Sequence, residues 1–93
     1  MSIRILLADD HPLTRAGIAE FLRREETFDL VAEAEDGDKA WELINELKPD
    51  VALLDIRMPG MDGVAVSQKV KLSNLHTATI MLTSYDAQQY VMA

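Results

Sequence analysis

The chain alternates short apolar runs with amphipathic stretches, and no other feature constrains its fold as strongly. Apolar runs with the length of buried strands occupy residues 3–8, 30–34, 51–54 and 79–82. Helical spacing of apolar residues follows over residues 12–25, between residue 38 and Pro49, and over residues 64–72, and Asp86 can cap one more helix. This order predicts an α/β fold in which parallel strands form one sheet with helices on both faces.

Two details refine this expectation. The first helix is expected to bury one face, formed by Ala16, Ile18, Phe21 and Leu22. Glu33 interrupts the second apolar run, which indicates a half-exposed strand at the outside of the sheet.

Composition excludes several classes of function. Nine basic and 16 acidic residues give a formal net charge of −7, which argues against a nucleic-acid surface within these 93 residues. The absence of cysteine excludes disulfides, thiolate metal sites and cysteine nucleophiles. No segment has the pattern of a signal peptide or a membrane span, so we expect a cytoplasmic protein that does not contact membranes.

Polar residues follow three of the predicted strands. Asp9 and Asp10 follow the first strand, Asp55 follows the third, and Thr83 follows the fourth. Parallel sheets bind ligands outside the carboxyl ends of their strands. Three carboxylates there favour either a shared proton or a hard cation such as Mg²⁺. In that setting Asp55 can attack phosphorus as a carboxylate nucleophile, and Thr83 can donate its hydroxyl to a phosphoryl oxygen.

Each of these residues also has a structural interpretation. An Asp9–Asp10 pair after a strand can be a solvated loop, Asp55 can be a turn residue, and Thr83 can simply end its strand. His11 lies beside the acidic pair, and we expect it to cap or pack at the start of the first helix rather than bind a metal.

Three blocks of sequence, residues 5–13, 49–63 and 80–84, resemble the receiver domain of bacterial two-component response regulators. The pattern Asp9-Asp10-His11-Pro12-Leu13-x-Arg15-x-Gly17 is similar to the NarL/LuxR-type subgroup. The resemblance implies a flavodoxin-like (CheY-like), doubly wound parallel sheet. Its strand order here would be 2-1-3-4, with the family's fifth strand and helix missing. Residues 1–93 are therefore expected to form one receiver domain that is incomplete at its C-terminus.

The resemblance also implies a role for each residue at the strand ends. Asp55 would be the phosphoacceptor, and Asp9 and Asp10 would be the acidic pair that organises Mg²⁺ together with Asp55. Arg57 would supply a main-chain carbonyl ligand, and Thr83 would be the switch hydroxyl. The chain would then be a signalling phosphoacceptor that catalyses only its own phosphotransfer, and not an enzyme with turnover.

Partners follow from the same resemblance. A histidine kinase would supply the phosphoryl group, and a helix-turn-helix domain downstream would bind DNA. The sequence departs from the family at one functional position, because its last lysine is Lys71 and no lysine ends a fifth strand. The run 79–82 carries no charge, which is typical of a strand flanked on both sides. Without a fifth strand, its exposed edge is therefore expected to pair with another copy or a swapped segment.

Two other functions remain open at this point. The missing lysine favours a receiver-like interaction module that does not signal by phosphorylation. A Mg²⁺-dependent phosphatase with an aspartyl nucleophile is the third class, although Asp55-Ile56-Arg57 lacks the second aspartate that such enzymes use as a general acid.

Overall fold

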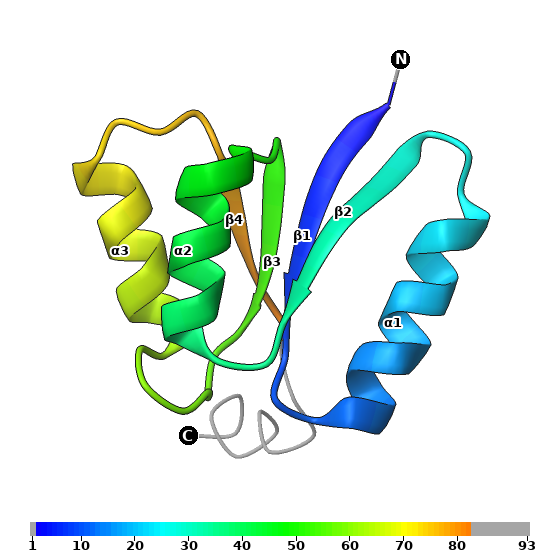
Figure 1. The fold of residues 1–93 in the computed structure, drawn as a ribbon, viewed down its shortest axis with the longest axis horizontal. Coiled ribbons are helices and arrows are strands. Elements are labelled where there is room, and N and C mark those ends of the chain that lie inside the picture. The colour runs from blue at the N-terminus through cyan, green and yellow to red at the C-terminus, as the bar shows by residue number, and fades with distance from the viewer. Residues whose placement is uncertain (1, 83–93) are drawn as a thin grey trace, which may run out of the picture.

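The computed structural model describes residues 2–82, and Figure 1 shows them as a sheet between helices. The elements in chain order are β1 (Ile3–Ala8), α1 (Pro12–Arg24), β2 (Phe28–Ala34), α2 (Gly37–Leu47), β3 (Val51–Asp55), α3 (Gly63–Leu72) and β4 (Ala78–Leu82). The predicted alternation of strands and helices is confirmed. The predicted last helix and Thr83 lie outside the described residues.

The four strands form one parallel sheet in the order β2-β1-β3-β4. The predicted order is therefore confirmed, and β2 takes the outer position that Glu33 indicated. Ala8 pairs with Ala34 on one side and with Leu54 on the other. Because the strands are parallel and end at the same level, the residues that follow β1 and those that end β3 meet at one edge of the sheet.

The core lies on both faces of the sheet, and alternate residues of β1 contribute to each face. Leu6 and Ala8 pack with Ile44 of α2 and with Val66 and Val70 of α3. On the opposite face, Ile5 and Leu7 pack with Ala19 and Leu22 of α1. Every one of these side chains is buried, so the end of β1 is held rigidly between two packed layers.

One part of the predicted core is wrong. Phe21 is 61% exposed and Ala16 is also exposed, whereas Ala19 and Leu22 form the buried face of α1. Each residue turns an α-helix by about 100°, so Phe21 lies far from the middle of a face centred between Ala19 and Leu22. The apolar spacing of α1 fits two faces, and only packing against β1 and β2 selects between them.

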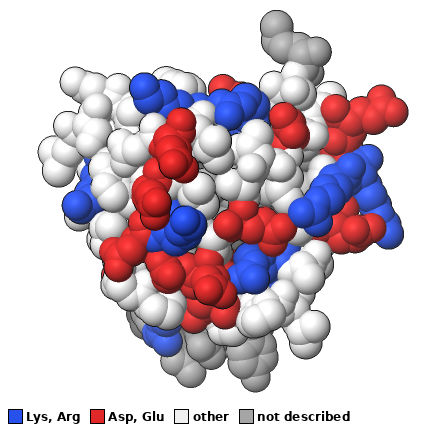
Figure 2. All heavy atoms as spheres, in the orientation of Figure 1, with Lys and Arg blue, Asp and Glu red and all other residues white. Residues whose placement is uncertain are grey.

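Acidic and basic side chains are interspersed on one face of the molecule (Figure 2). On the face shown in Figure 2, the Lys and Arg side chains are separated by Asp and Glu rather than gathered in one patch. The expectation that these residues bind no nucleic acid stays a prediction. Within residues 2–82, no helix has both the length and the apolar character needed to cross a membrane.

The start of α2 packs directly against the loop between β3 and α3. The Gly37 N–H donates to the Pro59 carbonyl oxygen at 3.1 Å. A Cβ atom at Gly37 would overlap the carbonyl group of Met61. We therefore expect Gly37→Ala to displace the loop and to lower the free energy of unfolding by about 3 kcal/mol, as measured by urea denaturation.

Gly17, in the middle of α1, provides the matched control for this experiment. A Cβ atom there meets nothing within 4 Å. Because alanine is the better helix former, Gly17→Ala should raise the free energy of unfolding by about 1 kcal/mol. Equal effects of the two substitutions would contradict the close approach at Gly37.

Candidate functional site

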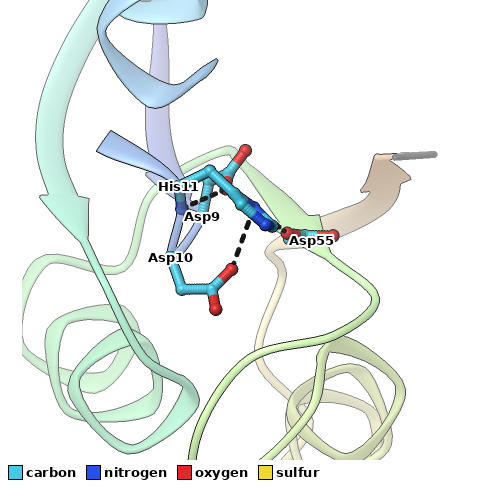
Figure 3. Close-up of side chains that lie close together, drawn as sticks. All are labelled: Asp9, Asp10, His11 and Asp55. Atoms are coloured by element: carbon cyan, nitrogen blue, oxygen red, sulfur yellow. Dashed lines mark hydrogen bonds and ion pairs between the residues drawn. The ribbon is translucent and has the colours of Figure 1, made fainter. Parts of the chain in front are cut away.

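Four side chains converge where β1 and β3 end. Asp9, Asp10 and His11 follow β1 directly, and Asp55 is the last residue of β3. Figure 3 shows these side chains pointing toward one another, and each offers a ligand atom within 4.8 Å of those of the others. The structure thus brings together the three carboxylates that the sequence places at the strand ends, and it adds His11 to them.

The three carboxylates differ in burial. Asp9 and Asp55 are 3% and 2% exposed, whereas the side chain of Asp10 is 31% exposed. Asp9 is fixed further by its neighbours, because its N–H donates to the Ala34 carbonyl oxygen at 3.0 Å and its Oδ1 accepts from the His11 N–H at 2.8 Å. The site therefore combines two buried carboxylates with one at its opening.

His11 stands at the start of α1, as the sequence predicts, and its side chain faces the carboxylates. His11 is the N-cap residue of α1, but its side chain makes no capping hydrogen bond. Its Nδ1 instead lies 3.1 Å from Asp9 Oδ1, 3.1 Å from Asp10 Oδ1 and 3.6 Å from Asp55 Oδ2. The hydrogen bond to Asp9 and the charge of Asp10 raise the pKa of His11 above its usual value, which favours the imidazolium beside these acids.

Two buried carboxylate oxygens in this cluster accept no hydrogen bond within the described part of the chain. They are Asp10 Oδ1 and Asp55 Oδ2. His11 Nδ1 lies equally close to Asp9 Oδ1 and Asp10 Oδ1, and it carries at most one proton to share between them. Buried carboxylate oxygens without a hydrogen bond are costly, and hard cations such as Mg²⁺ prefer oxygen ligands of this kind. The donor set therefore fits the predicted Mg²⁺ site.

Asp55 is the carboxylate whose ionised form this arrangement disfavours. Its burial, followed by the charge of Asp9, raises the pKa of Asp55, while a hydrogen bond from the main chain of Arg57 opposes the shift. A raised pKa means that the folded protein binds this proton more readily than the unfolded chain does. The ionised carboxylate therefore destabilises the fold at neutral pH, and this cost disappears as the pH falls to the ordinary value of 3.8.

Asp55→Asn tests this cost directly. In buffer without divalent cations, we expect the substitution to raise the free energy of unfolding at neutral pH by about 1 to 2 kcal/mol, because it removes a buried charge with an unpartnered oxygen. The gain should shrink as the pH falls toward 3.8. Urea denaturation of both proteins at each pH measures it, and a destabilised variant at neutral pH would refute this electrostatic account.

The remaining predicted site residues are Arg57 and Thr83. Arg57 lies two residues after the end of β3, with an exposed side chain, and its main chain bonds the Asp55 carboxylate. Thr83 lies outside the described residues. Arg15 is a contributor to which the sequence assigned no role: its side chain reaches back from α1 to the Asp9 carbonyl oxygen. Its place in the pattern shared with the NarL/LuxR-type subgroup was the available signal.

The fold and this site define a flavodoxin-like α/β domain with an acidic cluster at the carboxyl ends of its strands. The chain belongs to the response regulator receiver domain family, whose model matches residues 5–93. The predicted family and fold are thereby confirmed.

Individual relatives agree with this family. The chain is 44% identical over 84 residues to a protein named as a probable transcriptional regulatory protein, NarL, of Mycobacterium tuberculosis, covering 90% of this chain and 39% of the relative. It is 41% identical to the response regulator VraR of Staphylococcus saprophyticus, covering 91% of this chain and 41% of the relative. The chain thus spans about two fifths of these relatives.

Solved structures give the same result. The signal receiver domain of a NarL response regulator from Mycobacterium tuberculosis superposes with a TM-score of 0.88 at 44% identity, covering 91% of this chain and 68% of that one. The response regulator domain of Thermotoga maritima CheB superposes with a TM-score of 0.84 at 32% identity, covering 90% and 62%. The predicted NarL/LuxR-type relationship is confirmed.

Proposed function

We propose that residues 1–93 act as one receiver domain that accepts a phosphoryl group on Asp55 in a Mg²⁺-dependent reaction. One observation carries this proposal: Asp55 ends a central strand as a buried carboxylate whose Oδ2 has no hydrogen-bond partner in the described residues. An unpartnered oxygen keeps a lone pair available for attack on phosphorus.

The cation would be held by the carboxylates of Asp9, Asp10 and Asp55 together with the main-chain carbonyl of Arg57. Asp10 supplies the clearest support, because its buried Oδ1 lacks a hydrogen-bond partner while the side chain borders the opening of the site. When bound, Mg²⁺ would offset the charges of these carboxylates and of the phosphoryl oxygens.

For the phosphoryl transfer itself, the protein mainly has to hold the reacting groups in position. Asp55 Oδ2 forms a new bond to phosphorus while the bond between phosphorus and a histidine nitrogen of a partner kinase breaks. The electron pair of the broken bond stays with the imidazole nitrogen. The rigid end of β3 holds the nucleophile in place, and the hydroxyl of Thr83 would donate to a phosphoryl oxygen as the switch group.

The output would lie outside these residues. The curated relatives are named as regulatory proteins, and this chain covers about two fifths of their length. We propose that phosphorylation of Asp55 switches a downstream helix-turn-helix domain that binds DNA, and that the protein works in the cytoplasm. The added phosphoryl charge beside Asp9 and Asp10 is the local event that would drive the switch.

Self-association is a further part of this proposal. In the described part of the chain, β4 is the last strand of the sheet, and Ile80 within it is 51% exposed. An apolar strand edge of this kind can pair with a second copy or a swapped segment. Sedimentation equilibrium should then show a dimer, and a monomer at high concentration would argue against it.

One observation favours a second function. The last lysine is Lys71, which ends no strand but lies exposed in the last turn of α3. If no lysine pairs with the phosphoryl group, these residues would instead serve as an interaction module that is not controlled by phosphorylation.

Acetyl phosphate separates the two functions. The 93-residue protein should gain the mass of one phosphoryl group when Mg²⁺ is present, and it should gain none when the cation is chelated. The same mass gain in both conditions would exclude the proposed Mg²⁺ dependence. No gain in either condition would leave the interaction module as the better assignment.

A further inference from the structure

Arg15 connects α1 to the loop that carries the acidic pair. Its Nη1 donates to the Asp9 carbonyl oxygen at 2.8 Å, and its Nε lies 3.3 Å from Glu33 Oε1 on β2. The side chain is only 21% exposed. One guanidinium therefore contacts both Asp9 and the outer strand β2. A planar group with several donors can make both contacts at once.

The position of this contact on Asp9 matters for Asp10. The Asp9 carbonyl belongs to the peptide plane that joins Asp9 to Asp10, so holding that oxygen holds the plane that carries the Asp10 nitrogen and Cα, from which the Asp10 side chain extends. The N–H of Asp9 is held by Ala34 and its Oδ1 by the His11 N–H. The hydrogen bond to the Asp9 carbonyl oxygen is the contact of Asp9 that depends on a side chain from the body of α1.

Glu33 anchors the guanidinium. Its Oε1 pairs with Arg15 Nε, while its Oε2 accepts a hydrogen bond from Arg23 Nη2 at 2.9 Å. The position of Glu33 in the second apolar run thereby has a physical explanation beyond an outer strand. Arg23 shares this carboxylate with Arg15, and this contact of Arg23 involves no residue of the acidic cluster.

We propose that Arg15 is a positioning residue for cation binding, which it supports by holding the Asp9–Asp10 peptide through a guanidinium anchored on Glu33. This inference rests on the proposed Mg²⁺ site. Groups outside the ligand set that orient ligands contribute strongly to metal affinity. Arg15 contacts neither the cation nor the phosphoryl group, and its effect passes entirely through Asp9 and Asp10.

A purely electrostatic role for Arg15 predicts the opposite change in Mg²⁺ affinity when its side chain is removed. A positive charge near the carboxylates repels Mg²⁺, so removing it would tighten binding if charge were all that mattered. Positioning predicts weaker binding on removal. Arg15→Lys separates the positioning role from the electrostatic role further. Lysine keeps the charge but cannot contact both Asp9 and Glu33 through one planar group.

The test uses the 93-residue protein and MgCl₂ alone, titrated at constant ionic strength and followed by the backbone amide resonances of Asp10 and His11. We expect Arg15→Gln and Arg15→Lys each to raise the Mg²⁺ dissociation constant about tenfold. Arg23→Gln, which loses an ion pair with the same Glu33, is the matched control and should bind Mg²⁺ as the wild type does.

The outcomes are distinct. Wild-type affinity in both Arg15 variants, or tighter binding in Arg15→Gln, would overturn the inference while leaving the Mg²⁺ site intact. Equal weakening in Arg23→Gln would also overturn it, because it would assign the effect to the ion pair on Glu33. Absence of Mg²⁺ binding by the wild type would overturn the proposed site and this inference together. If Arg15→Gln does not fold, Arg15→Lys decides.

Discussion

Asp55→Asn is expected to abolish phosphoryl incorporation from acetyl phosphate. An amide cannot form the acyl phosphate that the buried carboxylate would form, and no other group ends β3 in its place. The loss should be complete within the detection limit of intact-mass measurement. Since the same substitution is expected to stabilise the fold, a loss of reactivity cannot be attributed to unfolding.

Asp62→Asn is the matched control for this experiment. Asp62 lies in the loop after β3 and accepts a hydrogen bond from the Ala65 N–H at 2.8 Å as the N-cap of α3. Asparagine caps helices about as well as aspartate, so this variant should fold and incorporate phosphate like the wild type. Wild-type labelling of Asp55→Asn would contradict the proposed phosphoacceptor.

Asp10→Asn is expected to produce the second large effect, a loss of Mg²⁺ affinity of about tenfold or more. Asp10 contributes a buried, unpartnered oxygen at the opening of the site. A ligand at ten times its dissociation constant raises the free energy of unfolding by about 1.4 kcal/mol. At the same MgCl₂ concentration, a tenfold weaker site would gain only about 0.4 kcal/mol. Urea denaturation with and without MgCl₂ measures both gains.

Asp36→Asn controls for the general removal of negative charge. Asp36 caps α2, and its Oδ1 accepts a hydrogen bond from the Lys39 N–H at 2.7 Å. This variant should keep the full gain from Mg²⁺. If Asp10→Asn kept the same gain as the wild type, Asp10 would not belong to the cation site.

The alternation of apolar runs was sufficient to predict the parallel sheet, and the resemblance to receiver domains supplied its strand order. Strands buried on both faces have nearly continuous apolar sequences, so β1 and β3 could be located from residues such as Leu6 and Leu54. The meeting of Asp9, Asp10 and Asp55 could be predicted for the same reason, because residues that follow parallel strands emerge at one edge of the sheet.

Three features of the structure were not predicted from the sequence, and they have a different physical origin. Phe21 fits an amphipathic helix in two orientations, and the buried choice depends on contacts with distant strands. His11 lies at the helix start as expected, but three carboxylates from two strands attract its ring. The role of Arg15 depends on Glu33, which is 18 residues away in sequence. Interactions of this kind come from tertiary packing and have no local pattern.

The assignment of Asp55 as the phosphoacceptor depends most on the location of the phosphoryl group. Reduction of the phosphorylated protein with borohydride converts an aspartyl phosphate to homoserine, and peptide mass spectrometry then identifies the modified residue. We predict homoserine at position 55 and at no other aspartate, and only in samples treated with acetyl phosphate and Mg²⁺. Homoserine at Asp9 or Asp10, or a phosphoryl group on any residue other than Asp55, would contradict the account.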